Sequence, residues 1–326
     1  MKNQSVSICT RRFLAAMVLA VVTFQSAYAG NSFSKIVVFG DSINDRGNMT
    51  ALTGGVFPAP PTYAYGRQSN GPVWVEYLAA QLKLQDRVVD YAVVGALTKP
   101  APGFPTGNVW SDTFPGLDGT DVFSQVLAHL SENGSADPAA LYILEGGAND
   151  FPRVQNPAAI VNNLLEMLVG LQARGARHIV LVNLPDIGKT PRVILGERFG
   201  FLAPGTAAFV SGACAQLNQA LEALLPAYTY PGVKITIADT FGFINRAAAQ
   251  PALFGLVDVQ APFLLTGNGG DPSQWLFWDD LHPTTRGHEI FAETVAESLL
   301  LTYSPGKAGG KGALNSLHGL VGAPGR

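Results

Sequence analysis

The chain has 326 residues, of which 47% are hydrophobic and 14% charged, with 36 glycines, 22 prolines and a formal net charge of −3. Few charges and abundant Gly and Pro exclude a charge-rich disordered chain and a coiled coil. The basic residues do not cluster, which argues against nucleic-acid binding, and two cysteines are too few for a disulfide scaffold.

The first 29 residues have the pattern of a secretory signal peptide. Basic residues precede an apolar run over residues 13–24, and Ala27-Tyr28-Ala29 offers a small-x-small cleavage site. The run is shorter than the ~20 residues that span a bilayer, so an uncleaved anchor is the weaker alternative. Cleavage after Ala29 leaves 297 residues, a net charge of −6 and one cysteine, Cys214. We expect a secreted or periplasmic protein without an integral membrane segment.

In the rest of the chain, short apolar β-branched runs alternate with longer amphipathic segments. The predicted elements are a strand over 35–39, a helix over 73–82, a strand over 87–94, a helix over 121–130, a strand over 141–144, a helix over 157–173, a strand over 178–183, a helix over 207–225, a strand over 233–238 and a helix over 286–300. This alternation predicts one α/β domain over residues 30–303, with a parallel sheet and right-handed crossovers. The Gly-rich residues 304–326 are expected to form a flexible tail.

Four segments rich in Gly, Pro and aromatic residues are predicted as loops, over 49–72, 97–118, 185–205 and 241–278. Each follows a predicted strand. Because ligands bind at the carboxyl ends of the strands in an open parallel sheet, we expect these loops to wall a pocket. Thr285 is the expected N-cap of the last helix.

Sequence markers of several enzyme classes are absent. The chain has no Gly-x-Ser-x-Gly elbow, no phosphate-binding loop, no Gly-x-Gly-x-x-Gly after the first strand and no paired zinc-ligand spacing among its five histidines. We therefore expect neither a metal nor a cofactor.

A serine directly follows the first predicted strand, in Gly40-Asp41-Ser42. A serine needs a base to become a nucleophile, and His282 is the best candidate. Asp279, three residues earlier, can orient the imidazole, and Asp280 beside it is the alternative acid.

Four sequence blocks resemble those of the GDSL, or SGNH, hydrolases. Residues 38–48 (VFGDSINDRGN) resemble the first block, 90–96 (DYAVVGA) the second, 146–150 (GGAND) the third and 277–284 (FWDDLHPT) the last. They occur in family order, and residues 67–74 are similar to a segment of the secreted lipase-like branch. The resemblance implies a flavodoxin-like three-layer α/β/α sandwich with five parallel strands.

The resemblance also implies residue roles. Ser42 matches the nucleophile, Asp279 and His282 match the rest of a triad, and the Ser42 and Gly95 N–H groups with the Asn149 amide match the oxyanion hole. If the strand order is 2-1-3-4-5, the residues after strands 1, 2 and 3 meet at one edge of the sheet.

The chain departs from the family pattern in three places. Asp90 stands where the second block usually opens with Asn, Val94 stands where Gly-Gly is common, and Ile43 replaces Leu. We expect Asp45 and Asn48 to hold together the loop after Ser42. Asp150 is expected to brace Asn149 or to cap the following segment, and His129 and His178 are expected to be structural.

The function implied is a secreted serine hydrolase that cleaves carboxylic esters through an acyl-enzyme, of esterase, lipase or phospholipase type. A carbohydrate acetylesterase or an acyltransferase of the same fold is the alternative, and a non-catalytic binding module is a further one. The expected partner is a small ester or lipid substrate and not a nucleic acid. The sequence does not indicate an oligomeric state.

Overall fold

The computed structural model describes residues 33–153, 156–266 and 269–303. The predicted signal peptide and the predicted tail lie outside these residues. Phe33–Val295 form one compact unit, which holds the sheet, and the described part of a second unit is Ala296–Tyr303, the end of the last helix. None of the helices in the described ranges has the length and apolar character needed to cross a bilayer.

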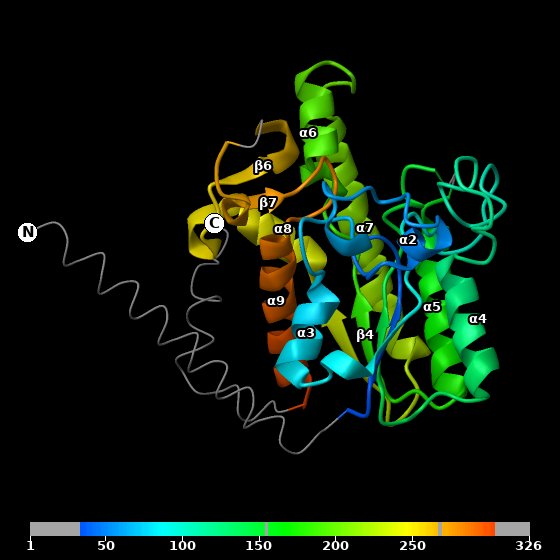
Figure 1. Cartoon of the computed structure of the whole chain (residues 1–326). Helices are drawn as coiled ribbons and strands as arrows, with labels where there is room; N and C mark the ends of the chain where they lie inside the picture. Colours follow the sequence, from blue (N-terminus) through cyan, green and yellow to red (C-terminus); the bar gives the residue numbers. More distant parts are fainter. Residues whose placement is uncertain (1–32, 154–155, 267–268, 304–326) are drawn as a thin grey trace, which may run out of the picture. The chain divides into compact units, whose positions relative to one another are not determined.

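A five-stranded parallel sheet forms the centre of the large unit (Figure 1). Its strands are β1 (Ile36–Phe39), β2 (Val88–Asp90), β3 (Leu141–Leu144), β4 (His178–Val182) and β5 (Lys234–Ala238). Their order is β2-β1-β3-β4-β5 and every neighbouring pair is parallel, which confirms the predicted architecture. The chain adds β2 on one side of β1 and β3 on the other. Because all three strands are parallel, their carboxyl ends lie side by side at one edge of the sheet.

The second strand is shorter than predicted, because residues 91–94 leave the ladder. Val93 N still donates to Gly40 O, but the carbonyl groups of Asp90 and Ala92 accept the side-chain amide of Asn48 instead of a strand partner. The apolar run 91–94 therefore forms a loop toward the end of β1.

Each predicted helix is present with small shifts of its ends: α3 (Trp74–Leu82), α4 (Val122–Asn133), α5 (Ala158–Ala173), α7 (Thr206–Tyr228) and α9 (Thr285–Tyr303). The predicted N-cap of α9 is wrong by one residue. Thr284 Oγ1 accepts Gly287 N at 3.1 Å, as an N-cap hydroxyl does, whereas Thr285 Oγ1 donates to Pro72 O.

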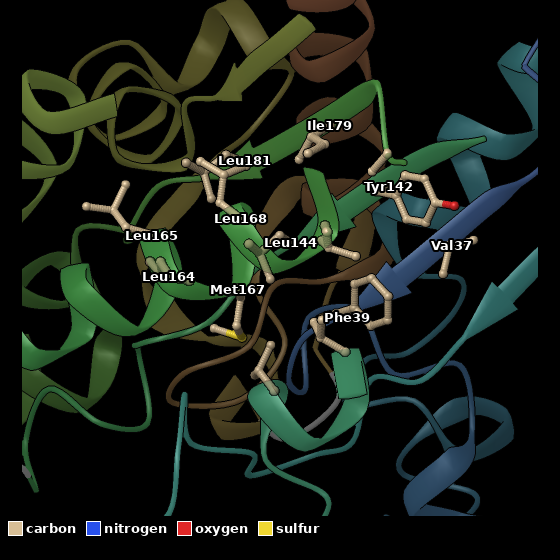
Figure 2. Close-up of a cluster of buried hydrophobic side chains, with 14 of the residues drawn as sticks. Val37, Phe39, Tyr142, Leu144, Leu164, Leu165, Met167, Leu168, Ile179 and Leu181 are labelled. Carbon is tan, nitrogen blue, oxygen red and sulfur yellow. The ribbon is translucent and has the colours of Figure 1, made fainter. Parts of the chain in front are cut away.

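Alternate residues of the strands pack on opposite faces of the sheet. Val37, Phe39, Tyr142 and Leu144 belong to one buried cluster with side chains of α4, α5 and α7 (Figure 2). On the other face, Phe291 of α9 contacts Trp74 of α3. It also contacts Phe243 of α8 (Thr240–Ala249), the helix that follows β5. These two helix layers enclose the sheet and complete the three-layer sandwich.

The prediction of long loops is wrong in three of the four segments. They contain α2 (Asn48–Leu52), α6 (Pro191–Arg198), α8 (Thr240–Ala249) and a small parallel pair, β6 (Asp258–Pro262) and β7 (Trp275–Phe277). Short 3-10 turns lie at Ala64–Gly66, Gln85–Arg87, Ile187–Lys189, Pro251–Phe254, Phe263–Thr266 and Pro272–Gln274.

Local chemistry explains two of the missed helices. Helix α6 begins with Pro191 at its first position, where proline costs no hydrogen bond. Helix α8 is capped by Asp239, whose carboxylate accepts Gly242 N at 2.8 Å. Both helices are short and lie close to glycines and prolines in the sequence, so the helical spacing of their apolar residues was not recognised.

Candidate active site

The structure brings all five predicted site residues to one cavity. Ser42, Gly95 and Asn149 follow β1, β2 and β3, and Asp279 and His282 lie in the loop between β7 and α9. Together they line a cavity of about 210 Å³. A larger hollow of about 560 Å³ between α7 and β5 is open and contains none of these residues.

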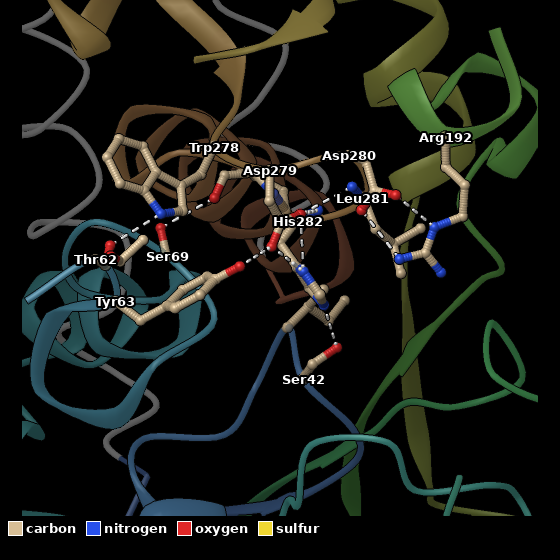
Figure 3. Close-up of polar contacts among 12 residues, drawn as sticks. Ser42, Thr62, Tyr63, Ser69, Arg192, Trp278, Asp279, Asp280, Leu281 and His282 are labelled. Carbon is tan, nitrogen blue, oxygen red and sulfur yellow. Dashed lines mark hydrogen bonds and ion pairs between the residues drawn. The ribbon is translucent and has the colours of Figure 1, made fainter. Parts of the chain in front are cut away.

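Consecutive hydrogen bonds join the three triad candidates Ser42, His282 and Asp279 (Figure 3). His282 Nε2 lies 2.9 Å from Ser42 Oγ, and His282 Nδ1 lies 2.8 Å from Asp279 Oδ2. Asp279 Oδ1 also accepts the N–H groups of Leu281 and His282, so the carboxylate is fixed by its own turn. The imidazole is therefore held in the orientation that general-base catalysis requires.

Electrostatic interactions between Asp279 and His282 favour an ion pair of carboxylate and imidazolium. Burial opposes ionisation of Asp279, but the charge of His282 and its hydrogen bonds outweigh this and hold the pKa of Asp279 far below its usual range. Burial likewise opposes the imidazolium, but Asp279 and then Asp41 raise the pKa of His282 above its ordinary value. A proton taken from Ser42 would thus be stabilised on His282.

The alternative acid, Asp280, turns away from the imidazole. Its carboxylate accepts two N–H groups of Arg192 on α6, at 2.9 and 3.0 Å, and its backbone carbonyl accepts Arg192 N. Figure 3 shows this pair on the far side of the loop from Tyr63. Of these two neighbouring acids, Asp279 is the one whose side chain is hydrogen-bonded to the His282 ring.

Two backbone N–H groups at the cavity are free to bind an anion. Neither Ser42 N nor Gly95 N donates to an acceptor in the described residues. Gly95 has a φ of +81°, and a Cβ there would lie 2.5 Å from the Trp110 ring, so this position requires glycine. Asn149 Nδ2 donates to Asp41 Oδ2 at 3.0 Å and to Ala96 O at 3.1 Å, so a substrate oxygen would share one of its hydrogens.

The loops that carry these groups are tied to one another. As expected, Asp45 holds the loop after Ser42: its carboxylate accepts Gly47 N, Asn48 N and Met49 N, and it also accepts Val94 N, next to Gly95. The expectation for Asp150 is wrong. Its carboxylate accepts the N–H and hydroxyl groups of Thr98, which joins the loop after β3 to the loop after β2.

Two buried acids lie next to Ser42. Asp41 and Glu145 are each 2% exposed, and Glu145 Oε2 accepts Asp41 N and the side-chain amide of Asn44. Burial and then the charge of Asp41 raise the pKa of Glu145 well above its ordinary value. Asn44 Oδ1 in turn accepts Trp74 Nε1 at 2.7 Å, which links the turn to α3. The sequence did not indicate Glu145 as part of this site.

Tyr63 is a second residue that sequence reasoning missed. Its hydroxyl donates to Asp279 Oδ2 at 2.9 Å, across 216 positions of sequence. Burial and the neighbouring carboxylate raise the pKa of Tyr63, so it remains a donor. The only sequence signal was an aromatic residue in a loop expected to wall the pocket.

We expect Tyr63→Phe to lower kcat by up to about 10-fold, because it removes one hydrogen bond to a charged acceptor. Tyr65→Phe is the matched control, since Tyr65 is 88% exposed and two residues away. Steady-state kinetics on one ester substrate measures both. Equal kcat values in the two variants would show that the Tyr63 hydroxyl does not support Asp279.

Asp90, which departs from the family pattern, gives a stability prediction. Burial and then the charge of Asp45 raise its pKa to about 8, although its carboxylate accepts Arg46 N and Ala92 N. In the unfolded chain an aspartate has a pKa of about 3.9. Between these values the unfolded chain has lost a proton that the folded chain retains, so the free energy of unfolding falls as the pH rises.

Asp90→Asn removes this titration. We therefore expect the difference in unfolding free energy between the variant and the native chain to grow in favour of the variant as the pH rises. The increase is at most about 1.4 kcal/mol for each pH unit between about pH 5 and 7. Urea unfolding at several pH values measures the slope, and the exposed Asp118→Asn is the control. Parallel pH curves for native and Asp90→Asn protein would contradict the prediction.

Three of the four predicted loops contribute to the cavity wall. Phe57, Tyr63 and Gln68 come from the first, Val109 and Trp110 from the second, and Arg192 from the third. The fourth, over 241–278, supplies none of the lining residues. The ring centroids of Phe57 and Trp110 lie 4.7 Å apart, and the two rings form an apolar side of the cavity.

The sequence model of the family described as "GDSL-like Lipase/Acylhydrolase" matches residues 36–295. The chain belongs to this family. The GDSL chain is 26% identical to the thermolabile hemolysin of Vibrio parahaemolyticus over 84% of its own length and 65% of the relative's. It is 31% identical to the phosphatidylcholine-sterol acyltransferase of Aeromonas hydrophila, over 55% of its own length and 52% of the relative's.

A third relative is matched over nearly its whole length. The GDSL chain is 26% identical to an acetylesterase of Thermothelomyces thermophilus, over 88% of its own length and 97% of the relative's. By contrast, it spans less than two thirds of the length of the Vibrio and Aeromonas relatives. Of these three relatives, one is thus named an acyltransferase and one an acetylesterase.

Proposed function

We propose that this GDSL protein hydrolyses carboxylic esters through an acyl-enzyme formed on Ser42. The observation that carries the proposal is the position of His282, whose two ring nitrogens lie 2.9 Å from Ser42 Oγ and 2.8 Å from Asp279 Oδ2. Membership of the GDSL-like lipase/acylhydrolase family supports the same chemistry.

In the first half of the reaction, His282 Nε2 accepts the Ser42 proton while Ser42 Oγ attacks the ester carbonyl carbon. The Ser42 and Gly95 N–H groups, with the Asn149 amide, stabilise the oxyanion. His282 then gives the proton to the leaving alcohol oxygen, and the C–O bond breaks. Asp279 stabilises the imidazolium throughout.

In the second half, water replaces the alcohol. His282 accepts a proton from water, the hydroxyl group attacks the acyl carbon, and Ser42 Oγ leaves with the proton from His282. If a second alcohol takes the place of water, the same steps transfer the acyl group. Hydrolysis is the main proposal, and the Aeromonas relative's name supports transfer as the alternative.

We also propose that the protein is exported. The basic residues, the apolar run and the Ala27-Tyr28-Ala29 site at the N-terminus support cleavage by a signal peptidase. Sequencing the N-terminus of protein recovered outside the cytoplasm tests this. A mature chain that starts at Gly30 is expected, and an intact N-terminus would contradict export by cleavage.

The function is tested with a fluorophosphonate probe and a panel of esters. We expect the probe to modify one serine, Ser42, as found by peptide mapping. The panel contains p-nitrophenyl esters of increasing chain length, acetylated sugars and phospholipids, each with and without an added alcohol. Preference for acetyl groups would favour the acetylesterase reading, and preference for long chains the lipase reading. Failure to react with the probe and with every ester would favour a non-catalytic binding protein.

A further inference from the structure

The cavity beside Ser42 has an apolar part and a charged part. Phe57, Val94, Val109 and Trp110 supply the apolar part, which suits an acyl chain. Arg153, Arg192 and Asp280 supply the charged part, together with the loop that holds His282. Because His282 protonates the leaving oxygen, the alcohol half of an ester would lie on the charged part.

The two lining carboxylates already have partners. Asp279 accepts hydrogen bonds from His282 and Tyr63, and Asp280 accepts two from Arg192. Neither carboxylate is therefore left to compensate a further positive charge.

Arg153 has no such partner. Among the described residues no carboxylate lies within ion-pair distance of it, and Nη1 donates to Asn149 O at 2.8 Å. The neighbouring carboxyl, that of Asp150, is occupied by the N–H and hydroxyl groups of Thr98. The guanidinium lies 5.7 Å from the centre of the Phe104 ring. Apart from the bond of Nη1 to Asn149 O, its N–H donors have no acceptor in the described residues.

The two arginines also repel each other. Burial and then the charge of Arg192 lower the pKa of Arg153, and the charge of Asp150 offsets only part of this. A bound anion would offset both effects. The salt bridge to Asp280 meanwhile fixes the direction of Arg192 beside the cavity.

We propose that Arg153, assisted by Arg192, binds an anionic group, phosphate or carboxylate, on the alcohol half of the ester substrate. Guanidinium groups bind such oxyanions through paired N–H donors. This inference rests on the proposed ester hydrolysis at Ser42 and narrows it to esters of acidic alcohols.

The test compares two soluble substrates that differ by one phosphate group, the butyrate ester of glycerol and the butyrate ester of glycerol 3-phosphate. The measured quantity is the ratio of kcat/KM for the anionic ester to kcat/KM for the neutral one. We expect Arg153→Gln to lower this ratio about 10-fold, mainly through KM, and Arg153→Lys to restore part of it. Added salt should lower the ratio in the native enzyme more than in Arg153→Gln.

Arg174→Gln is the matched control. Arg174 is exposed, lies outside the cavity and, like Arg153, donates to a backbone carbonyl, that of Gly134. The ratio should be the same in this variant as in the native enzyme. A butyrate ester of glyceric acid, which carries a carboxylate, shows whether the subsite distinguishes the two anions.

The outcomes separate this inference from the proposed function. If the native enzyme hydrolyses both esters with a ratio that Arg153→Gln does not change, the anion subsite is wrong and the esterase function stands. If neither ester is hydrolysed, calorimetric titration with glycerol 3-phosphate decides. Binding that Arg153→Gln weakens supports the subsite, and absence of binding to the native protein overturns it.

Discussion

Ser42→Ala is expected to lower kcat/KM for ester hydrolysis on the order of 10⁶-fold, the effect seen when a triad serine is removed. Alanine lacks the oxygen that attacks the carbonyl carbon, so no acyl-enzyme can form. The other donors at the cavity stay in place, because the proposed role of residue 42 in the oxyanion hole needs only its backbone N–H, which alanine keeps. The variant should therefore still bind substrate and should retain a low residual rate.

Initial rates on a chromogenic ester measure this loss, and the fluorophosphonate probe should no longer label the protein. Ser131→Ala, at an exposed serine of α4, is the control for handling and folding. Hydrolysis at more than a few per cent of the native rate by folded Ser42→Ala protein would mean that the nucleophile is another residue.

Asp279→Asn is expected to lower kcat about 10⁴-fold, the effect seen in serine hydrolases whose triad acid becomes an amide. The amide can donate to His282 Nδ1, which would place the proton on Nε2 and leave no base facing Ser42. The variant should stay folded, because the amide oxygen still accepts the N–H groups of Leu281 and His282 that Asp279 Oδ1 binds.

The pH dependence gives a second measure of the same change. Asp279 raises the pKa of His282, so its removal should lower that pKa and move the acid limb of kcat/KM to lower pH. Asp280→Asn breaks the salt bridge to Arg192 and should lower kcat by less than about 10-fold. If Asp280→Asn gave the larger loss, the two neighbouring acids would have exchanged roles.

The sheet and its five principal helices could be predicted because their patterns are local. An uninterrupted run such as Ile36–Phe39 is buried on both faces, and an amphipathic segment such as Ala158–Ala173 has one apolar face. Helices α6 and α8 were missed because their start signals, Pro191 and Asp239, stand among residues typical of loops. The shortening of β2 depends on Asn48, which lies 42 and 44 positions before the two residues whose carbonyl groups it binds.

The same contrast applies to the site. Ser42, Gly95, Asn149, Asp279 and His282 were predicted from motifs, and the structure brings them to one cavity. The contacts of Tyr63 with Asp279 and of Arg192 with Asp280 join segments 216 and 88 positions apart. Such pairs follow from how loops of different strands meet, and no local pattern contains that information.

The link from Trp74 through Asn44 to the turn of Ser42 has a spectroscopic consequence. The Trp74 indole is fully buried, and its N–H is bonded to Asn44 Oδ1 at 2.7 Å. Water that enters this turn will therefore shift the fluorescence emission of Trp74 to the red. Because the chain has four tryptophans, the emission is measured in a variant whose other three are replaced by phenylalanine. Compared with far-ultraviolet circular dichroism, it will show whether the turn that carries Ser42 opens before the sheet unfolds. The fluorescence of Trp74 thus indicates whether the turn that carries Ser42 is intact.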